Sequence, residues 1–312
     1  FLVPTAKGGS QLTEWQPGSS FFEEARSRAE FAADSLGIPV SAVVWFQGES
    51  ETKYAETRRD FIEDTDSVLK AFHDDLPGNP EIIFVQLSKR LYHGPASGNE
   101  KGHNLAYQEI REKQRLMEAG AKQLAVGSNS PSESGKDRPY YHMVVSHDLP
   151  MSDVKHLSAA AQRALGGRIA NTFLSSVWTG STNGTFSIGP RLERVILTGD
   201  KRSILVDTTM EINDSAHYNG YFAVFVGGEK RAYQSIGRDA NDPTRVRIGF
   251  DAPLSGNVQV RYMPPDGTPL YQGSGQAVHG IVGGLRLQLP AFGGPVEPLA
   301  MEFFPGLRQS ED

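Results

Sequence analysis

Two residues three positions apart, Asp153 and His156, are the ones best suited to chemistry, and they lie just ahead of a segment with the pattern of a capped helix. In a loop that enters a helix, the carboxylate of such an Asp can turn back and accept the Nδ1 proton of the His. This contact fixes the tautomer of the ring and stabilises its charged form when Nε2 takes a proton from a serine hydroxyl. A surface loop with a solvated Asp and His would show the same spacing, so the pair needs support from other segments.

A second group of residues, Trp-Phe-Gln-Gly-Glu-Ser at positions 45–50, follows directly on an apolar segment that predicts a buried strand. In open α/β sheets, ligands bind just beyond the carboxyl ends of the strands. There Gln47 can present an amide donor to a developing oxyanion, and Gly48 lets the chain turn sharply. The same residues are also compatible with an ordinary strand-to-helix turn, in which Glu49 and Ser50 would be first-turn and cap residues.

A third group surrounds a pair of glycines near the start of the chain, again after a short apolar segment. Backbone N–H groups at Gly8 and Gly9 are able to line an oxyanion hole, because glycines leave the backbone accessible. A plain glycine-rich loop is the simpler interpretation, and the pair alone does not decide between the two.

The elements that must position these residues are short apolar segments alternating with amphipathic ones. The predicted strands cover residues 1–4, 42–46, 82–87, 123–126 and 143–146, and the predicted helices cover residues 21–36, 52–72, 105–119 and 158–173. Continuous apolar strands between helices are typical of a parallel sheet that is covered on both faces.

The second part of the chain has a different character. Residues 179–190 are rich in Gly, Ser, Thr and Asn and indicate a linker. Beyond it, apolar and polar residues alternate strictly between turn clusters, which predicts an antiparallel β-sandwich. We therefore expect a catalytic domain at residues 1–178 and an accessory domain at residues 191–312. Four tyrosines of this region are suited to stack on sugars and equally to lie in its core or rim: Tyr218, Tyr221, Tyr233 and Tyr271.

Together the three groups are far more specific than each alone. The order Gly-Gly-Ser-x-Leu-x-x-Trp (8–15), Trp-Phe-Gln-Gly-Glu-Ser (45–50) and Asp-x-x-His-Leu-Ser (153–158) resembles the sialate-O-acetylesterase-like carbohydrate esterases of the SGNH-hydrolase superfamily. The resemblance spans residues 1 to about 173. It implies an α/β fold, a flavodoxin-like three-layer sandwich with a parallel sheet, here followed by the C-terminal antiparallel β-sandwich.

The resemblance also implies roles for individual residues. His156 would be the general base and Asp153 would orient it. Gln47 and a backbone N–H of Gly8 or Gly9 would serve the oxyanion hole. Gly48 belongs to the same block as Gln47, and Glu49 would brace the site or contact the base. Ser10, Trp15 and Arg111 are candidate substrate contacts. Arg111 and Gln114 also form a helical Arg-x-x-Gln element.

The nucleophilic serine is the departure from the family pattern. In the family it lies in a turn after the first strand, ahead of the Gly-Gly block, and only seven residues precede that block here. We therefore expect the serine, with its strand and helix, on an N-terminal fragment or on sequence outside these residues. Losing that unit would expose apolar surface and an unpaired strand edge. Three internal serines are weaker candidates: Ser10, Ser35 at a predicted helix end, and Ser128 late in the chain.

The implied reaction is a two-step acyl transfer that needs no metal or organic cofactor, and the implied substrate is an O-acetylated carbohydrate. A non-catalytic carbohydrate-binding or structural protein on an esterase fold is one alternative, favoured by the missing serine. A general short-chain carboxylesterase is another. An extracellular, periplasmic or virion-associated location is expected in preference to the cytoplasm.

Composition excludes several other classes of protein. The chain has 312 residues and no cysteine, which excludes disulfides, thiolate zinc sites and cysteine nucleophiles. A net charge of −6 without a basic run argues against nucleic acid or an anionic membrane as partner. No apolar run approaches the ~20 residues of a membrane span. The spacings of His142, His147 and His156 do not fit a helical zinc pair, so we expect loop or surface roles for the first two.

Overall fold

The computed structural model describes residues 1–88, 98–118, 138–153, 155–177, 189–212 and 221–262, together with four short strands between residues 279 and 298. For those four strands and for residues 98–105, only the backbone elements are described.

The elements of the first part are η1 (Leu12–Trp15), α1 (Ser20–Leu36), β1 (Ala42–Trp45), η2 (Glu51–Lys53), α2 (Ala55–Arg59), α3 (Phe61–Asp75), β2 (Glu81–Gln86), α4 (Gly98–Met117), β3 (Tyr141–Val145) and α5 (Ala159–Val177). The strands of the second part are β4 (Leu192–Leu197), β5 (Ser203–Thr208), β6 (Phe222–Val226), β7 (Glu229–Arg231), β8 (Ser235–Arg238), β9 (Arg245–Gly249), β10 (Val258–Tyr262), β11 (His279–Val282), β12 (Leu285–Gln288), β13 (Phe292–Pro295) and β14 (Glu297–Pro298).

The first part is built on a parallel sheet with the strand order β1-β2-β3. Both pairings are parallel, as the sequence predicted: Trp45 lies opposite Phe84, and Phe84 lies opposite Met143. The carboxyl ends of the three strands therefore meet at one edge of the sheet, which is where loops from different strands can combine into a site.

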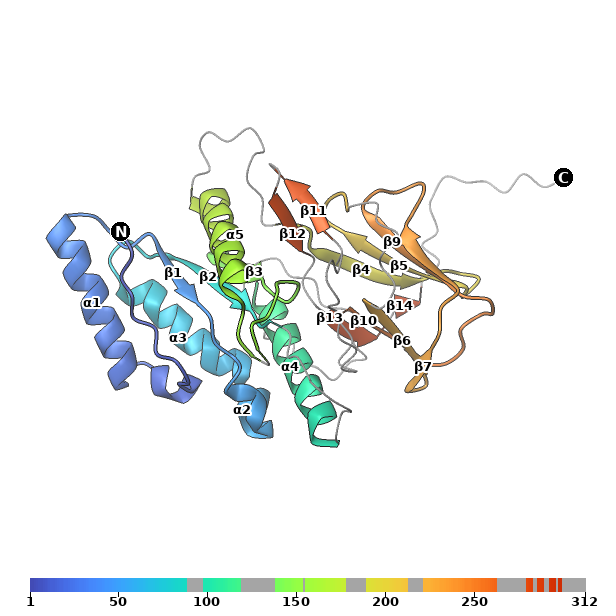
Figure 1. Ribbon diagram of the computed structural model, residues 1–312, viewed down its shortest axis with the longest axis horizontal. Helices are drawn as coiled ribbons and strands as arrows, with labels where there is room; N and C mark the ends of the chain where they lie inside the picture. The colour runs from blue at the N-terminus through green and yellow to red at the C-terminus, as the bar shows by residue number, and fades with distance from the viewer. Residues whose placement is uncertain are drawn as a thin grey trace.

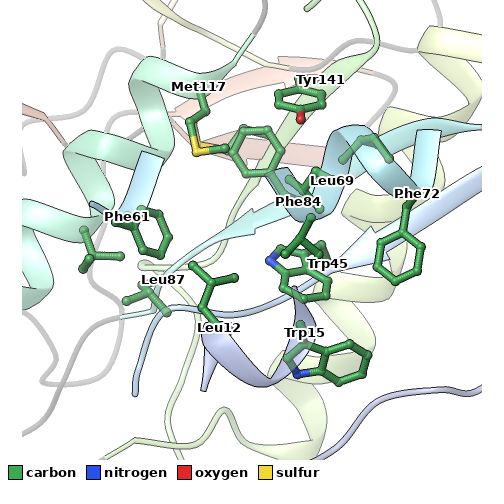
Figure 2. Packing of buried hydrophobic residues seen from close by; sticks show 14 of the residues in the cluster. Leu12, Trp15, Trp45, Phe61, Leu69, Phe72, Phe84, Leu87, Met117 and Tyr141 are labelled. Carbon is green, nitrogen blue, oxygen red and sulfur yellow. The ribbon is translucent and has the colours of Figure 1, made fainter. Parts of the chain in front are cut away.

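Helices cover both faces of this sheet (Figure 1). Alternate residues of β2 point to opposite faces, so Ile82 and Phe84 join one buried cluster, and Ile83 and Val85 join another. All four side chains are at most 2% exposed. The first cluster, shown in Figure 2, packs the sheet against α1, α3 and α4, whereas the second packs it against α5. Burial on both faces explains why the sequence of β2 is continuously apolar.

Two predicted elements differ from the observed ones. The helix expected over residues 52–72 is divided into η2, α2 and α3, because side-chain hydroxyls compete for backbone acceptors in its first part: Thr52 donates to the carbonyl of Glu49, and Thr57 donates to that of Glu51. The segment 1–4 was predicted as a strand and is extended without strand pairing in the described part of the chain. The strand predicted at residues 123–126 and the linker core at residues 179–188 lie outside the described residues.

The second part consists of separate sheets in which neighbouring strands are antiparallel, apart from the parallel pair of β14 with β4. One sheet has the order β14-β4-β5-β9-β8, another β13-β10-β6-β7, and a third is the hairpin β11-β12. Alternate residues of β4, β5, β6, β9 and β10 enter one shared core cluster. Tyr221 is buried in that core and Tyr233 packs against it, while Tyr218 and Tyr271 lie outside the described residues.

The two parts are joined by buried polar contacts at the outer edge of β3. The guanidinium of Arg191 makes two hydrogen bonds to the Glu118 carboxylate, at 2.6 and 2.7 Å, and a third to the Met143 carbonyl at 2.7 Å. Glu118 in turn accepts from the Met143 N–H at 3.1 Å. His147 lies in the turn after β3, as expected for a loop residue, but its side chain is fully buried edge-on against Tyr262 rather than exposed at the surface. Packing against the second part buries it.

No helix in the described part of the chain is both long and apolar enough to cross a membrane.

Candidate active site

The Asp153–His156 pair forms the contact that its spacing predicted. Nδ1 of His156 lies 2.7 Å from Oδ2 of Asp153. The other carboxylate oxygen, Oδ1, accepts hydrogen bonds from the backbone N–H groups of Lys155 and His156, both at 2.8 Å. Two backbone donors therefore fix the carboxylate, and the carboxylate fixes the orientation of the ring.

The loop that carries the pair is closed on itself. The N–H of Ser152 donates to the His156 carbonyl at 2.8 Å, and the N–H of Ser158 donates to the Pro150 carbonyl at 3.0 Å. The Ser158 hydroxyl then accepts from the N–H of Ala161 at 3.2 Å and caps α5, as predicted. The hydrogen bonds within this loop and the cap at the N-terminus of α5 position the segment that carries His156.

The electrostatics of the pair suit a base that is open to solvent. Hydrogen bonds from the Lys155 backbone, the His156 side chain and the His156 backbone lower the pKa of Asp153 to about 2, so this carboxylate is ionised at neutral pH. The His156 side chain is 74% exposed and that of Asp153 is 54% exposed. Among the described residues no side chain hydrogen-bonds to Nε2 of His156, which leaves this atom facing solvent for proton transfer.

Gln47 connects the second motif to the first loop of the chain. Its Nε2 donates to the Ser10 carbonyl at 2.9 Å and to Glu51 at 3.1 and 3.3 Å. An amide nitrogen carries two hydrogens, so both are engaged here. The sequence predicted an oxyanion donor at Gln47, whereas in this structure its amide braces two loops.

Glu51 is a site residue that the sequence reasoning missed. Its side chain is 3% exposed, and Oε1 accepts from the N–H of Leu12 at 2.7 Å. Burial raises the pKa of Glu51, and the hydrogen bonds from Leu12 and Gln47 oppose the increase. The sequence does show Glu51 as a second acidic residue two positions after Glu49. However, Leu12, whose N–H it binds, lies far away in the sequence.

Gly48 can only be glycine in this arrangement. Its φ is +141°, and an added Cβ would lie 3.0 Å from Cγ2 of Ile110 and 3.1 Å from Cγ of Leu87. On the same side, Gln114 donates to the Gln47 carbonyl at 3.0 Å and accepts from the Leu87 N–H at 2.8 Å. The Arg-x-x-Gln element of α4 therefore holds the motif against the end of β2.

Glu49 lies within electrostatic range of the histidine. Burial raises the pKa of Glu49, and the negative charge of Glu51 raises it further, while its own backbone N–H and the charges of His156 and Lys155 lower it. A role for Glu49 as a brace of the site or a contact of the base stays a prediction.

The first motif supplies a turn and a buried anchor. Gly8 and Gly9 are exposed, and Gly9 has a φ of +77°, which favours glycine. Ser10 is 6% exposed; its hydroxyl donates to the Lys7 carbonyl at 2.9 Å and accepts from Nε1 of Trp15 at 2.8 Å. Trp15 is 5% exposed. Ser10 and Trp15 were expected to contact substrate, and the structure instead places both side chains in the core beneath the turn.

Arg111 is also buried rather than placed at a surface. It is 4% exposed and donates to the Ser88 carbonyl at 3.1 Å and to Gln108 at 3.3 Å. Burial lowers the pKa of Arg111 to about 10. In this structure the side chain of Arg111 supports the segment after β2.

The other candidate residues do not join the site. Ser35 is exposed near the end of α1, and Ser128 lies outside the described residues. His142 belongs to β3 and its Nε2 lies 2.6 Å from a carboxylate oxygen of Glu81, near the amino ends of the strands. Within the described ranges, no group of three or more His, Cys, Asp or Glu side chains is arranged to hold a metal ion.

The first part of the chain is similar to known carbohydrate esterases. Residues 1–175 match the family model described as carbohydrate esterase, sialic acid-specific acetylesterase. A protein of Arabidopsis thaliana described as a probable carbohydrate esterase is 29% identical over 175 residues, which make up 56% of this chain and 55% of the relative. The chain thus spans about half the length of that curated relative.

Two solved structures are also similar. A carbohydrate acetylesterase from Xanthomonas citri is 15% identical, with a TM-score of 0.56 over 92% of this chain and 59% of that one, and it shares the fold. The crystal structure of an Arabidopsis thaliana protein is 26% identical, with a TM-score of 0.41 over 56% of this chain and 60% of that one.

Proposed function

The chain belongs to the sialic acid-specific acetylesterase family of carbohydrate esterases, and on that premise we propose that it removes acetyl groups from sugar hydroxyls by a serine-type acyl-enzyme mechanism. Family membership supports ester hydrolysis and a carbohydrate substrate. The observation that carries the mechanism is the 2.7 Å contact of His156 with Asp153, in a loop that leaves Nε2 free for a proton.

In the proposed reaction, His156 Nε2 takes the hydroxyl proton of a serine as the serine oxygen attacks the ester carbonyl carbon. Asp153 keeps the ring in the correct tautomer and stabilises its charged form. Backbone N–H groups at Gly8 or Gly9 stabilise the oxyanion. The sugar oxygen leaves with the proton from His156, and the acyl-enzyme remains. Water then repeats the sequence, releasing acetate and the serine.

The serine in this proposal comes from sequence N-terminal to Phe1. Two observations support this. No described serine donates a hydrogen bond to the His156 ring, and the Ser10 hydroxyl is buried between Lys7 and Trp15. Ser10 would have to break both contacts before it could attack a substrate.

The proposal extends to the architecture. We assign the parallel sheet and its helices, residues 1–178, to an SGNH-type three-layer catalytic domain. Residues 179–190 would be the linker, and residues 191–312 a β-sandwich accessory domain. The shared core cluster between the β4 and β6 sheets supports the second assignment.

The test is acetate release by the gene product expressed from its native start. An O-acetylated sialoside and acetylated xylan are compared with a long-chain p-nitrophenyl ester. We expect turnover of an acetylated sugar that His156→Ala abolishes, with His142→Gln as the matched histidine control. Preference for the long-chain ester would instead indicate a general carboxylesterase. Sugar binding without turnover would indicate a non-catalytic protein.

A further inference from the structure

The loop that carries His156 is anchored at both of its ends. Its two ends meet where the N–H of Ser158 donates to the Pro150 carbonyl at 3.0 Å. The loop leaves at the N-terminus of α5, which Ser158 caps. It enters from the turn at residues 146–149, which follows β3 and is closed by a backbone hydrogen bond of 3.0 Å between its first and last residues. The position of His156 therefore depends on the contacts that fix this turn.

The first part of the molecule fixes one side of the turn. Arg168 on α5 makes two hydrogen bonds to the Asp148 carboxylate, at 2.6 and 2.7 Å, and a third to the Val145 carbonyl at 2.7 Å. Both side chains of this ion pair are at most 7% exposed. Charge-assisted hydrogen bonds of this kind are strong and directional. The helix that caps the loop thus also holds the turn before it.

The antiparallel part contacts the same turn through an aromatic pair. The ring centroid of His147 lies 5.8 Å from that of Tyr262, and the two planes are 75° apart. Edge-to-face arrangements of this kind are favourable for aromatic rings. Tyr262 ends β10 and packs in turn against Phe222 at 5.0 Å and Tyr221 at 6.3 Å. All three belong to the core cluster of the antiparallel part, so His147 is packed against that core.

A second tyrosine of the antiparallel part lies close to the turn. Tyr221 is 5% exposed. Burial, and then the negative charge of Asp148, raise the pKa of Tyr221 to about 12. Tyr221 therefore lies within electrostatic range of Asp148. Two successive residues of the turn, His147 and Asp148, each have a tyrosine of the antiparallel part nearby.

From these contacts we infer that Tyr262 is a positioning residue for the catalytic base. Its ring holds His147 and the turn at residues 146–149, and the turn holds the loop in which Asp153 contacts His156. The family model matches residues 1–175, so it assigns no role to Tyr262. The identity of His156 as the base rests on the proposed function, whereas the contact between Tyr262 and His147 does not.

Loss of the Tyr262 ring would leave space beside His147. Truncating a large buried side chain leaves a cavity, because the surroundings relax only in part. The turn would then be able to move into this space and to take the start of the loop with it. Small movements matter here, since a misplacement of about 1 Å can cost about 10²-fold in rate. The 2.7 Å contact between His156 and Asp153 reports such a movement directly.

The competing explanation is that Tyr262 only stabilises the core of the antiparallel part. A residue with that role alone would change the free energy of unfolding when it is replaced. It would leave the His156 loop unchanged under conditions in which the protein is folded. The two explanations therefore differ in the state of the loop, which can be measured without catalysis.

The experiment is heteronuclear NMR of the His156 ring in the 312-residue chain, together with hydrogen–deuterium exchange of residues 150–158. In the parent protein, the neutral ring should carry its proton on Nδ1, because Asp153 accepts that proton. We expect Tyr262→Leu, studied below its unfolding transition, to show a mixture of the two tautomers. Amide exchange in the loop should become at least about tenfold faster.

Phe250→Leu is the matched control. Phe250 is 4% exposed and belongs to the same core cluster, and within the described residues its ring contacts no other aromatic ring. Its replacement should destabilise this core while leaving the His156 tautomer and the loop exchange at the parent values. Tyr262→Phe keeps the ring and should also match the parent. If Tyr262→Leu does not fold, His147→Leu removes the same contact from the other side and has the same expected result.

An unchanged tautomer and unchanged exchange in Tyr262→Leu would overturn the inference. So would a change of equal size in Phe250→Leu or in Tyr262→Phe. Neither readout involves a serine or a substrate, so the inference and the proposed function can fail separately. A Tyr262-dependent tautomer of His156 in a protein that releases no acetate would refute only the function.

Discussion

Replacing Arg191 by methionine should destabilise the α/β part of the molecule by several kilocalories per mole. The Arg191 side chain is 12% exposed and that of Glu118 is 4% exposed. Methionine keeps much of the aliphatic stem, but it leaves the Glu118 carboxylate buried without this cation and removes one donor from the Met143 carbonyl. Breaking a buried ion pair by removing one partner costs about 3–5 kcal/mol, which is the loss we expect in the free energy of unfolding.

Urea unfolding followed by tryptophan fluorescence measures this loss, because all three tryptophans precede β4. Arg231→Met is the control: Arg231 is 46% exposed and its partner Asp251 is 70% exposed, so its loss should cost less than about 1 kcal/mol. Adding Glu118→Gln to Arg191→Met should recover part of the stability, because the amide leaves no buried charge. A cost for Arg191→Met no larger than that of the control would refute the reasoning.

Three further predictions concern the site. Asp153→Asn in the native gene product should lower kcat about 10³–10⁴-fold by favouring the wrong tautomer of the base, and an unchanged rate of acetate release would remove Asp153 from the mechanism. Gly48→Ala should lower the free energy of unfolding by about 1–3 kcal/mol because its φ is +141°, and an unshifted melting temperature would contradict this. Because burial raises the pKa of Glu49, its ionisation costs stability as the pH rises through and above the ordinary carboxyl value. The stability of the Glu49→Gln variant relative to the parent protein should therefore be greater at about pH 8 than at about pH 4. A stability difference between the two proteins that does not change with pH would argue against a buried carboxyl.

The parts of the fold that local pattern determines were predictable from the sequence. The continuous apolar runs at residues 42–46 and 82–87 indicated strands, and these strands pair in parallel. The predicted burial holds for β2, whereas the prediction of a fully buried strand at residues 42–46 was wrong, because Val44 on β1 is 51% exposed. The spacing of Asp153 and His156 is short enough that a loop can close the contact by itself. Gly37, which has a φ of +66°, ends α1 where the sequence placed the end of the helix.

Features that depend on distant segments were not predictable in this way. Glu51 and Leu12 are 39 positions apart, and only the folded sheet brings them together. The burial of His147 requires β10, which is far along the chain. Gln47 was expected to face an oxyanion because its position after a strand suits that role, but its amide is engaged by Ser10 and Glu51.

Covalent labelling with a fluorophosphonate tests most directly whether His156 activates a serine supplied from ahead of Phe1. The native gene product is labelled, digested and mapped by mass spectrometry, beside its His156→Ala and His142→Gln variants. We predict one labelled serine, upstream of Phe1, with labelling lost in His156→Ala and kept in His142→Gln. Labelling of Ser10 or of another serine within residues 1–312, or equal labelling in the His156→Ala variant, would contradict the proposed mechanism.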